Sequence, residues 1–350
     1  MSQRFAATLM LAGIVSHPAA GQSCRATRTS IGDTAVSMPI APPSANAGLR
    51  LRRELELPGP PNRFDYQSID SARRRLYMNH MNGNETLVFD LDSERVVGRI
   101  PGVSRATGVL VVPALGKVYI SAAGNHRVAI VDDKSLKAVA SVPGIRFPDG
   151  IAYADNARKI FISDESGDAD VVADAATGDK RSTIPLGGEA GNTHYDRGSG
   201  CILVAVQTRN QLVAIDPQME RIVQRYDLPG SDHPHGFAID PERRLAFITS
   251  EANALLQVVD LRTMKILASH KVGDSPDVLA WDASWGRLYV ASEGGVLSAF
   301  RVDGVTLVRI ADLRIAHGHT VSVDPLTHRV HLPLESQGGH PLLRIYDAIR

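Results

Sequence analysis

Short runs of alternating apolar and polar residues, separated by turn-forming residues, follow one another from about residue 48 onwards. One such run recurs along the chain, and its central residue stands at Tyr77, Tyr119, Phe161, Leu203, Phe247, Tyr289 and His331. The intervals between these positions are 42, 42, 42, 44, 42 and 42 residues. An aspartate follows 13 residues later in five of the units, directly before a turn-like segment. Most of the chain therefore consists of seven copies of one repeat.

Each repeat is expected to form four short strands, as in Phe237–Ile239, Ala246–Thr249, Leu256–Val259 and Ile266–His270. Four strands in a repeat of roughly 40–45 residues are typical of a β-propeller blade. Solenoid repeats are usually shorter or helical, so that architecture fits less well. The sequence therefore predicts an all-β fold, a seven-bladed β-propeller with four-stranded blades.

The two ends of the repeat region suggest how the ring closes. The last unit finishes with Leu342–Ile349, which corresponds to a third strand, so this unit lacks a fourth strand. The segment Leu49–Leu57 alternates apolar and charged residues and is followed by Pro58-Gly59, as several fourth strands are. We expect this N-terminal strand to complete the last blade, which would remove the open sheet edges.

The first 47 residues lack the repeat and have a different character. Arg4 is followed by an apolar run from Phe5 to Val15 and then by small residues, which is the layout of a secretory signal peptide. The run is too short for a permanent membrane span. We therefore predict a signal peptide at 1–20, a flexible Ser-, Thr-, Ala- and Pro-rich leader at 21–47, and the propeller at 48–350. The protein would be periplasmic or secreted, without stable membrane insertion.

Composition narrows the range of partners. The chain has 38 basic and 38 acidic residues, and this balance argues against a nucleic-acid-binding protein, which would show a basic excess. The only cysteines are Cys24 and Cys201, which form no CxxC metal motif, and the sequence leaves open whether they pair. We expect a monomer whose partner is a small polar molecule, a metal ion or another exported protein.

Three of the repeats carry the residues Arg75-Leu76-Tyr77-Met78-Asn79, Gly116-Lys117-Val118-Tyr119-Ile120-Ser121 and Gly286-Arg287-Leu288-Tyr289-Val290-Ala291. With these motifs, residues 48–350 resemble the YVTN-repeat (YncE-like) seven-bladed propellers of exported bacterial proteins. The resemblance implies the fold and export. It does not select a function, because this family and its propeller relatives include binding proteins, lactonases, lyases and domains of redox enzymes.

Positions that are the same in many repeats are expected to serve the scaffold. An aspartate precedes the turn between the first and second strands at Asp70, Asp196, Asp240, Asp282 and Asp324. Aspartate at such a place accepts hydrogen bonds from the backbone of its own turn. Positions that break the repeat are the candidates for function.

Two sets of positions break the repeat. The start of the first strand carries Asp65, Thr107, Asp149, Gly191, His235, Asp277 and His319. The end of the second strand, 16 residues later, carries Met81, Ala123, Glu165, Gln207, Glu251, Glu293 and Glu335. In an antiparallel blade the first strand begins where the second one ends, so both rings should surround one mouth of the central channel.

Imidazole and carboxylate groups that converge at a channel mouth can bind a divalent ion or act as general acid and base. The predicted metal ligands are His235, Glu251, His319 and Glu335. The predicted ligand-binding residues are Arg63, Asp65, Arg105, Asp149, Glu165, His233, Asp277, Glu293 and His317. The candidates for a catalytic role are His194, His235 and His319. The alternative to a site is a polar, water-filled funnel that binds nothing.

Three functions fit this pattern. The first is a protein that binds a small polar ligand or a divalent metal without chemistry. The second is a metal-assisted lactone or ester hydrolase, or a lyase, in which a divalent ion polarises the substrate and a histidine moves the proton. The third is a scaffold for another exported protein. The sequence identifies neither the ligand nor the metal.

Overall fold

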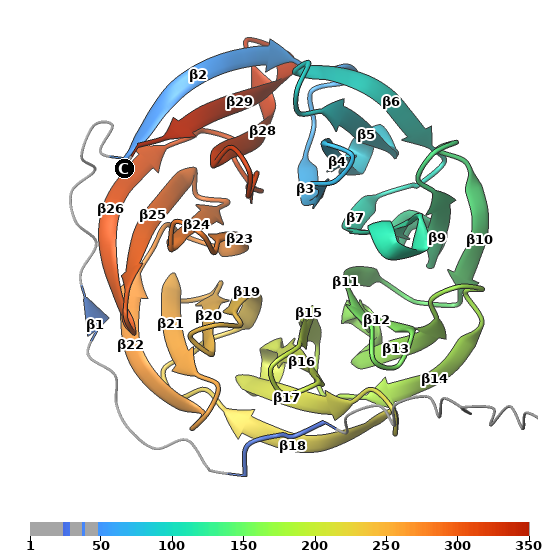
Figure 1. The fold of residues 1–350 in the computed structure, drawn as a ribbon, viewed down its shortest axis with the longest axis vertical. Coiled ribbons are helices and arrows are strands. Elements are labelled where there is room, and N and C mark those ends of the chain that lie inside the picture. The colour runs from blue at the N-terminus through green and yellow to red at the C-terminus, as the bar shows by residue number, and fades with distance from the viewer. Residues whose placement is uncertain (1–23, 29–36, 39–47, 350) are drawn as a thin grey trace, which may run out of the picture.

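The computed structural model describes residues 24–28, 37–38 and 48–349. Residues 48–349 form seven sheets of four antiparallel strands, arranged as blades around a central channel (Figure 1). This confirms the predicted seven-bladed β-propeller. The predicted signal peptide lies outside the described residues.

Six blades are formed by consecutive strands, with the first strand of each blade next to the channel. These strands are β3 (Phe64–Asp70), β4 (Arg75–His80), β5 (Glu85–Asp90), β6 (Arg95–Pro101); β7 (Ala106–Val112), β8 (Lys117–Ala122), β9 (Arg127–Asp132), β10 (Ala138–Pro143); β11 (Pro148–Ala154), β12 (Lys159–Asp164), β13 (Ala169–Asp174), β14 (Lys180–Pro185); β15 (Ala190–Asp196), β16 (Cys201–Val206), β17 (Gln211–Asp216), β18 (Arg221–Asp227); β19 (Pro234–Asp240), β20 (Leu245–Ser250), β21 (Leu255–Asp260), β22 (Lys265–Lys271); and β23 (Pro276–Asp282), β24 (Arg287–Ser292), β25 (Val296–Asp303), β26 (Thr306–Arg314). Within residues 48–349, five single-turn 3₁₀ helices lie between strands: η1 (Met81–Gly83), η2 (Pro113–Leu115), η3 (Ala123–Asn125), η4 (Glu165–Gly167) and η5 (Gln207–Arg209).

The seventh blade combines both ends of the repeat region. It consists of β27 (Ser322–Val323), β28 (Arg329–Gln337), β29 (His340–Ala348) and, on the outside, β2 (Leu49–Glu56). β2 pairs antiparallel with β29, from Leu49 opposite Ala348 to Glu56 opposite Leu342. The side chain of Leu49 is buried against blade 6, whereas Leu51 on the other face of the strand is exposed.

The core lies between neighbouring blades, and the repeated aromatic residue fills it. Tyr77 of β4 packs among Val109 and Val118 of the next blade, and Tyr119 of β8 packs among Ile160 and other residues of the blade after that. A large aromatic ring at this place buries apolar area from two blades at once. The aromatic position recurs every 42 residues because each blade supplies one such residue to one inter-blade core.

The turn aspartates have the predicted role and also a second one. Asp70 and Asp240 each accept two hydrogen bonds from backbone N–H groups of their own turns. Asp324 in blade 7 accepts one such bond, and in addition it binds both terminal nitrogens of Arg74 in blade 1, at 2.8 and 2.6 Å. A bidentate ion pair of this kind therefore joins the last blade to the first.

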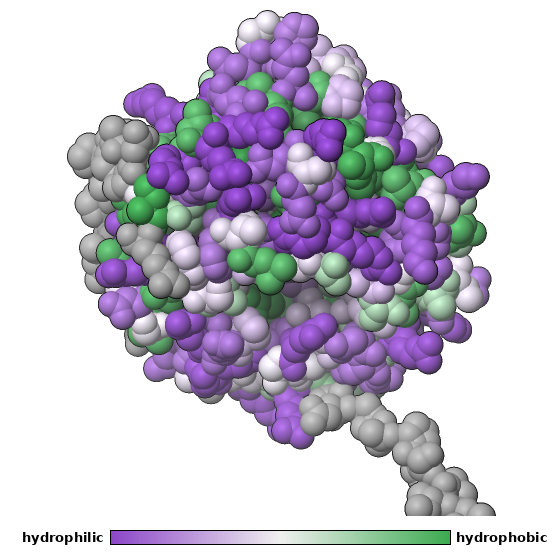
Figure 2. Space-filling view, turned by 45° about the horizontal axis from the view of Figure 1, so that its top comes forward, coloured by the Kyte–Doolittle hydropathy of each residue, from purple (hydrophilic) through white to green (hydrophobic). Residues whose placement is uncertain are grey.

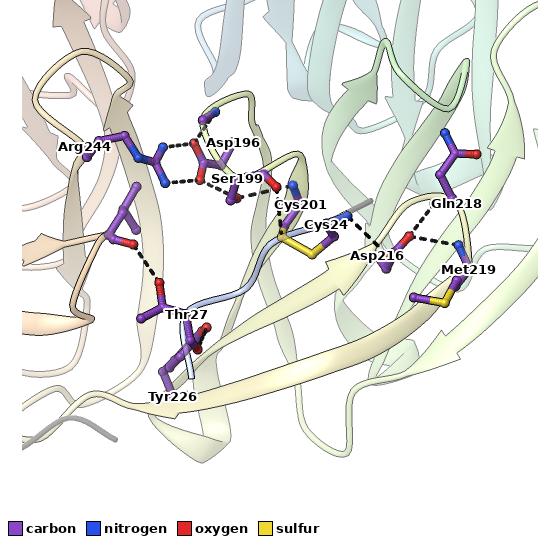
Figure 3. Close-up of a disulfide and its surroundings, with 12 residues drawn as sticks. Cys24, Thr27, Asp196, Ser199, Cys201, Asp216, Gln218, Met219, Tyr226 and Arg244 are labelled. Atoms are coloured by element: carbon purple, nitrogen blue, oxygen red, sulfur yellow. Dashed lines mark hydrogen bonds and ion pairs between the residues drawn. A yellow bond between two sulfur atoms is a disulfide. The ribbon is translucent and has the colours of Figure 1, made fainter. Parts of the chain in front are cut away.

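A short N-terminal segment is attached to blades 4 and 5 (Figure 3). Cys24 forms a disulfide with Cys201 of β16, so the question that the sequence left open is answered. Thr27 continues this contact, because its backbone oxygen accepts a hydrogen bond from Tyr226 and its hydroxyl donates one to the backbone of Leu261. Further along, β1 (Ser37–Met38) pairs in parallel with β22 at the rim of blade 5 (Figure 1).

The face drawn in Figure 2 is mostly hydrophilic, and hydrophobic residues lie on it in small separate groups. Several exposed apolar side chains, such as Val97, Val139 and Val308, belong to the outermost strands of their blades. Single exposed apolar residues are normal on a folded protein. Among the described residues, none of the helices has the length and the apolar character needed to cross a membrane.

The role of β2 in closing the ring can be tested with two leucines of the same strand. Leu49 is 1% exposed and Leu51 is 49% exposed. We expect Leu49→Ala to lower the free energy of unfolding by about 2–5 kcal/mol, as for other buried leucines. Leu51→Ala should change it by less than about 0.5 kcal/mol. Chemical denaturation measures both values, and equal effects of the two substitutions would contradict the placement of β2 in blade 7.

Candidate functional site

The two predicted rings of residues surround one mouth of the channel. In every blade, the N–H of the second-ring residue donates to a backbone oxygen two positions before the first-ring residue. The second-ring residue directly follows the second strand in blades 1 to 6, whereas Glu335 of blade 7 lies within β28. The donors are Met81, Ala123, Glu165, Gln207, Glu251, Glu293 and Glu335, and the acceptors are Arg63, Arg105, Phe147, Glu189, His233, Ser275 and His317. The expectation that both rings flank the same mouth is therefore confirmed.

A β-bulge directs the first-ring residues into the channel. In blade 1, Phe64 pairs with His80 but the next pair is Gln67 with Met78, so β3 carries one extra residue where Asp65 stands. The same irregularity occurs at the start of the first strand in blades 2 to 6. A bulge changes the direction of a side chain relative to a regular strand. The ring residues therefore leave the pleat of their sheets and converge on the channel axis.

Glycine next to the ring residue allows the blades to approach closely. A Cβ atom on Gly236 would lie 1.6 Å from the backbone oxygen of Asp277, and one on Gly108 would lie 1.9 Å from that of Asp149. Because such distances are impossible, only glycine fits at these two positions. The missing side chains thus set how near His235 and Asp277 come to each other.

One carboxylate, that of Asp277, lies between two histidines at the centre of the mouth. Its Oδ1 is 3.2 Å from Nε2 of His235, and its Oδ2 is 2.9 Å from Nε2 of His319. All three side chains are buried, with exposures of 4 to 7%. The sequence grouped each histidine with a carboxylate of its own blade, whereas the structure links blades 5 and 7 through the aspartate of blade 6.

Additional carboxylates surround His235. Oδ2 of Asp149 is 3.8 Å from its Nε2, and Oε1 of Glu251 is 3.9 Å from its Nδ1. Glu165 lines the same cavity, next to these groups. The predicted residues of blades 3, 5 and 6 thus form one acidic cluster around a single imidazole.

Arg63 and two further carboxylates surround His319. Oε1 of Glu293 is 3.1 Å from Nδ1 of His319, and Oδ1 of Asp65 is 3.5 Å from its Nε2. The Arg63 guanidinium binds Glu293 at 2.7 Å, and its other terminal nitrogen is 2.8 Å from Nε2 of His319. A fixed positive charge from blade 1 therefore lies on this half of the mouth.

Two residues that the sequence analysis did not select complete the centre. The hydroxyl of Tyr66 accepts a hydrogen bond from Asn192 at 2.8 Å and donates one to Oδ1 of Asp277 at 3.2 Å. It is also 3.1 Å from Nε2 of His235. Most blades have a small residue after the ring position, such as Gly108. Tyr66 is an exception to this pattern, and this exception is the feature of the sequence that could have identified it as a site residue.

The predicted site residues line three neighbouring cavities. The mouth cavity has a volume of about 260 Å³, and Arg63, Asp65, Arg105, Asp149, Glu165, His235, Glu251, Asp277 and Glu293 are among the residues that line it. Glu335 and His317 instead border a neighbouring cavity of about 210 Å³ together with His319. His194 borders a third cavity of about 190 Å³, which shares Tyr66 with the mouth cavity.

The other predicted histidines do not join the central cluster. The ring of His194 packs edge-on against Phe237, and burial lowers its pKa to about 4. His233 and His317 have left-handed backbones, with φ of 56° and 61°, and their side chains are exposed. Glu335 forms no ion pair with His319 in the described part of the chain.

Charge interactions at the centre shift several pKa values. Burial alone would raise the pKa of Asp277, but the two adjacent imidazoliums hold it well below its usual range. Burial would lower the pKa of His235 and of His319, but Asp277 and the surrounding carboxylates raise both well above 6.5. Burial raises the pKa of Glu165 to about 7, against the opposing effect of His235.

The donor groups are arranged as two potential metal sites that share Asp277. One group is Asp65, Asp277 and His319, and the other is His235, Glu251 and Asp277; within each, one ligand atom per residue lies within 4.8 Å of the others. Several buried polar atoms of the cluster have no hydrogen-bond partner. These atoms are Oδ1 of Asp65, Oδ2 of Asp149 and Nδ1 of His235. Buried polar atoms without partners are rare and often mark a place where a ligand binds.

Comparison with solved structures gives the same class of fold. The chain aligns with the β-propeller domain of Cps50 (Swd1) from Myceliophteria thermophila, with a TM-score of 0.71, 10% sequence identity, and coverage of 86% of this chain and 100% of that one. It also aligns with hydrazine synthase from Kuenenia stuttgartiensis, with a TM-score of 0.70, 14% identity, and coverage of 83% and 96%. The protein is thus a seven-bladed β-propeller, and identities this low establish the fold alone. No family model and no curated sequence matches the chain.

The pairing of Asp277 with two imidazoles should make stability depend on pH. Imidazoles with raised pKa values stabilise the fold below pH 6.5, and this contribution is lost as the pH rises through their folded-state pKa values. We expect Asp277→Asn to lower the free energy of unfolding by about 3–5 kcal/mol near pH 6, because it removes the one carboxylate that pairs with both buried imidazoles. The loss should become smaller towards alkaline pH.

Denaturation of chelator-treated protein between pH 5 and pH 9 measures this difference. Glu335→Gln is the matched control, because this carboxylate lies near the mouth but makes no ion pair with either histidine. An Asp277→Asn effect that stays the same across this range, or that matches the control, would show that the imidazoles are not held protonated by Asp277.

Proposed function

We propose that the protein is an exported β-propeller of the YVTN-repeat type that binds a divalent metal ion at the channel mouth, through His235, Glu251 and Asp277. The observation that carries this proposal is the convergence of imidazole and carboxylate groups with unpartnered buried atoms on one cavity. Buried charges are costly unless they are paired or coordinate a metal. An ion at this place would bind to donors that already lie close together, and it would replace the proton on His235.

Of the two groups that share Asp277, the one with His235 is better suited to a cation. The guanidinium of Arg63 already lies on the other group, 2.8 Å from His319 and 3.7 Å from Asp65. A second cation placed there would meet strong repulsion. Around His235, by contrast, the additional groups are the carboxyl groups of Asp149 and Glu165.

The donor set suggests which ions to test. An imidazole is a ligand that suits zinc and iron, and the two carboxylates also suit manganese. Three protein ligands also leave coordination positions for water or for a bound molecule, as in catalytic metal sites. The mouth cavity next to these ligands supplies the space.

A metal-assisted lactone or ester hydrolase, or a lyase, is the second candidate. It is favoured by Glu165, which lines the same cavity and is not among the three proposed ligands, so it could accept a proton beside the ion. Bound metal would polarise the carbonyl group of a substrate. A scaffold function for another exported protein becomes the better explanation if the chain binds no metal.

Export is part of the proposal. The disulfide between Cys24 and Cys201 supports it, because such bonds persist in oxidising compartments outside the cytosol. The motifs at 75–79, 116–121 and 286–291 support the assignment to the YVTN-repeat type, whose members are exported.

Metal binding can be tested with two histidines that lie two positions apart. We expect the purified parent protein to bind one divalent ion per chain, and His235→Ala to weaken that binding at least about tenfold by removing a ligand. His233→Ala is the control, because the side chain of His233 is exposed and outside the cluster. Elemental analysis and calorimetric titration with Zn²⁺ and Mn²⁺ measure both quantities. A parent that binds no ion, or equal binding by the two variants, would refute the metal site.

Export makes a separate prediction. Protein recovered from the medium or periplasm of a bacterial host should begin between Ala19 and Ser23, because cleavage is expected near Ala20 and Cys24 must remain for the disulfide. Mass spectrometry of the intact protein determines the N-terminus. An intact Met1, or a lipid mass on Cys24, would contradict soluble export.

A further inference from the structure

The mouth cavity contains a cationic side chain that has no anionic partner among the described residues. Arg105 lines this cavity, but its guanidinium forms no ion pair or hydrogen bond within the described residues. Arg63, which lines the same cavity, is different because it binds Glu293 at 2.7 Å and lies within 4 Å of Asp65 and Asp277. One arginine thus balances the acidic cluster, and the other is available to a ligand.

The position of Arg105 is fixed by its surroundings. Its backbone is left-handed, with φ of 48°. Its N–H donates a hydrogen bond to Oδ1 of Asn84, and its backbone oxygen accepts one from the N–H of Ala123. Its guanidinium lies 5.2 Å from the centroid of the Phe147 ring, a favourable cation–π distance. The backbone of Phe147 is held in turn by two hydrogen bonds. Its N–H donates to Oδ1 of Asp164, and its oxygen accepts from the N–H of Glu165.

Arg105 and the proposed metal ligands come from different parts of the ring. Arg105 precedes β7 in blade 2 and Phe147 precedes β11 in blade 3, whereas His235 and Asp277 belong to blades 5 and 6. Blade 4, which lies between them, has Gly191 at its ring position. The lining of the cavity therefore includes Arg105 and Phe147 from blades 2 and 3 and the proposed metal ligands from blades 5 and 6.

From this arrangement we infer that the ligand of the proposed metal site is a small organic molecule with two oxygen-bearing ends, at least one of them a carboxylate. The carboxylate pairs with the fork of Arg105, and the other end completes the coordination of the ion at His235, Glu251 and Asp277. This inference rests on the proposed metal-binding function. Arginine binds planar carboxylates through two parallel hydrogen bonds, which makes it suited to this task.

The size and lining of the cavity favour a short carbon chain. Its volume of about 260 Å³ exceeds the roughly 30 Å³ share of a water molecule several-fold, so a molecule of a few carbon atoms fits. Phe147 and Met81 provide apolar surface for methylene groups between the two polar ends. Inorganic phosphate would match Arg105 in charge but would not use this apolar surface.

The test uses the full chain and proceeds in two titrations. Chelator-treated parent, Arg105→Gln and Arg146→Gln are first titrated with Zn²⁺ by calorimetry, and the zinc-loaded proteins are then titrated with succinate. Arg146 is the matched control, because it is a neighbouring exposed arginine that does not line the mouth cavity. Succinamide, which lacks the charges, and inorganic phosphate are titrated in parallel.

We expect all three proteins to bind Zn²⁺ equally. Succinate should bind to the parent and to Arg146→Gln, and at least about tenfold more weakly to Arg105→Gln, because the charge-assisted hydrogen bonds are lost. Succinamide and phosphate should bind more weakly than succinate to the parent.

Two results would overturn the inference and can be told apart. If Zn²⁺ binds but succinate binds equally to parent and Arg105→Gln, or phosphate binds more tightly than succinate, the carboxylate assignment is wrong and the metal site remains. If Zn²⁺ does not bind to the parent, the metal-binding function itself fails, and the inference fails with it.

Discussion

The close approach of seven inner strands around one axis determines both the fold and the candidate site. The first strands of blades 1 to 6 begin with a bulge at the channel mouth, and the neighbouring backbone lies so close to Gly108 and Gly236 that there is no room for a side chain at either. This contact fixes the spacing of the blades where the ring residues project. The positions from which the ring residues project therefore depend on backbone packing.

Within this frame, the cluster is an electrostatic balance of buried groups. Asp277 lies between two imidazoles, and each imidazole in turn has carboxylates on its other side. Buried charges of one sign would be costly, so the arrangement is stable only with compensating cations. Arg63 supplies one from the chain itself, on the side of His319. On the side of His235 the compensation comes from a proton or, in our proposal, from a metal ion.

The sequence predicted the blades well because one physical requirement repeats in each of them. An aromatic or large apolar residue such as Tyr77 or Tyr119 must fill every inter-blade core, so its spacing appears directly in the sequence. The ring positions were recognisable because their residue types change from blade to blade. Contacts across the channel were not predictable in this way. Tyr66 reaches His235 over 169 positions, and Asp277 joins histidines of two other blades, which follows from the circular arrangement and not from local spacing.

The difference between repeated and variable positions also explains why the charged groups of the candidate site are distributed unevenly in a fold of nearly equal blades. Asp70 and Asp240 perform the same turn function in their blades, and substitution at such positions would affect the scaffold locally. At the mouth, blade 1 contributes Arg63 and Asp65 and blade 2 contributes Arg105, whereas blades 3, 5, 6 and 7 contribute carboxylates and histidines. A cavity that has positive groups in one part of its lining and negative groups in another distinguishes ligands by the order of their polar groups as well as by their total charge. Because a symmetric ring of identical residues could not do so, the departures from the repeat are the features that make selective binding at this mouth physically reasonable.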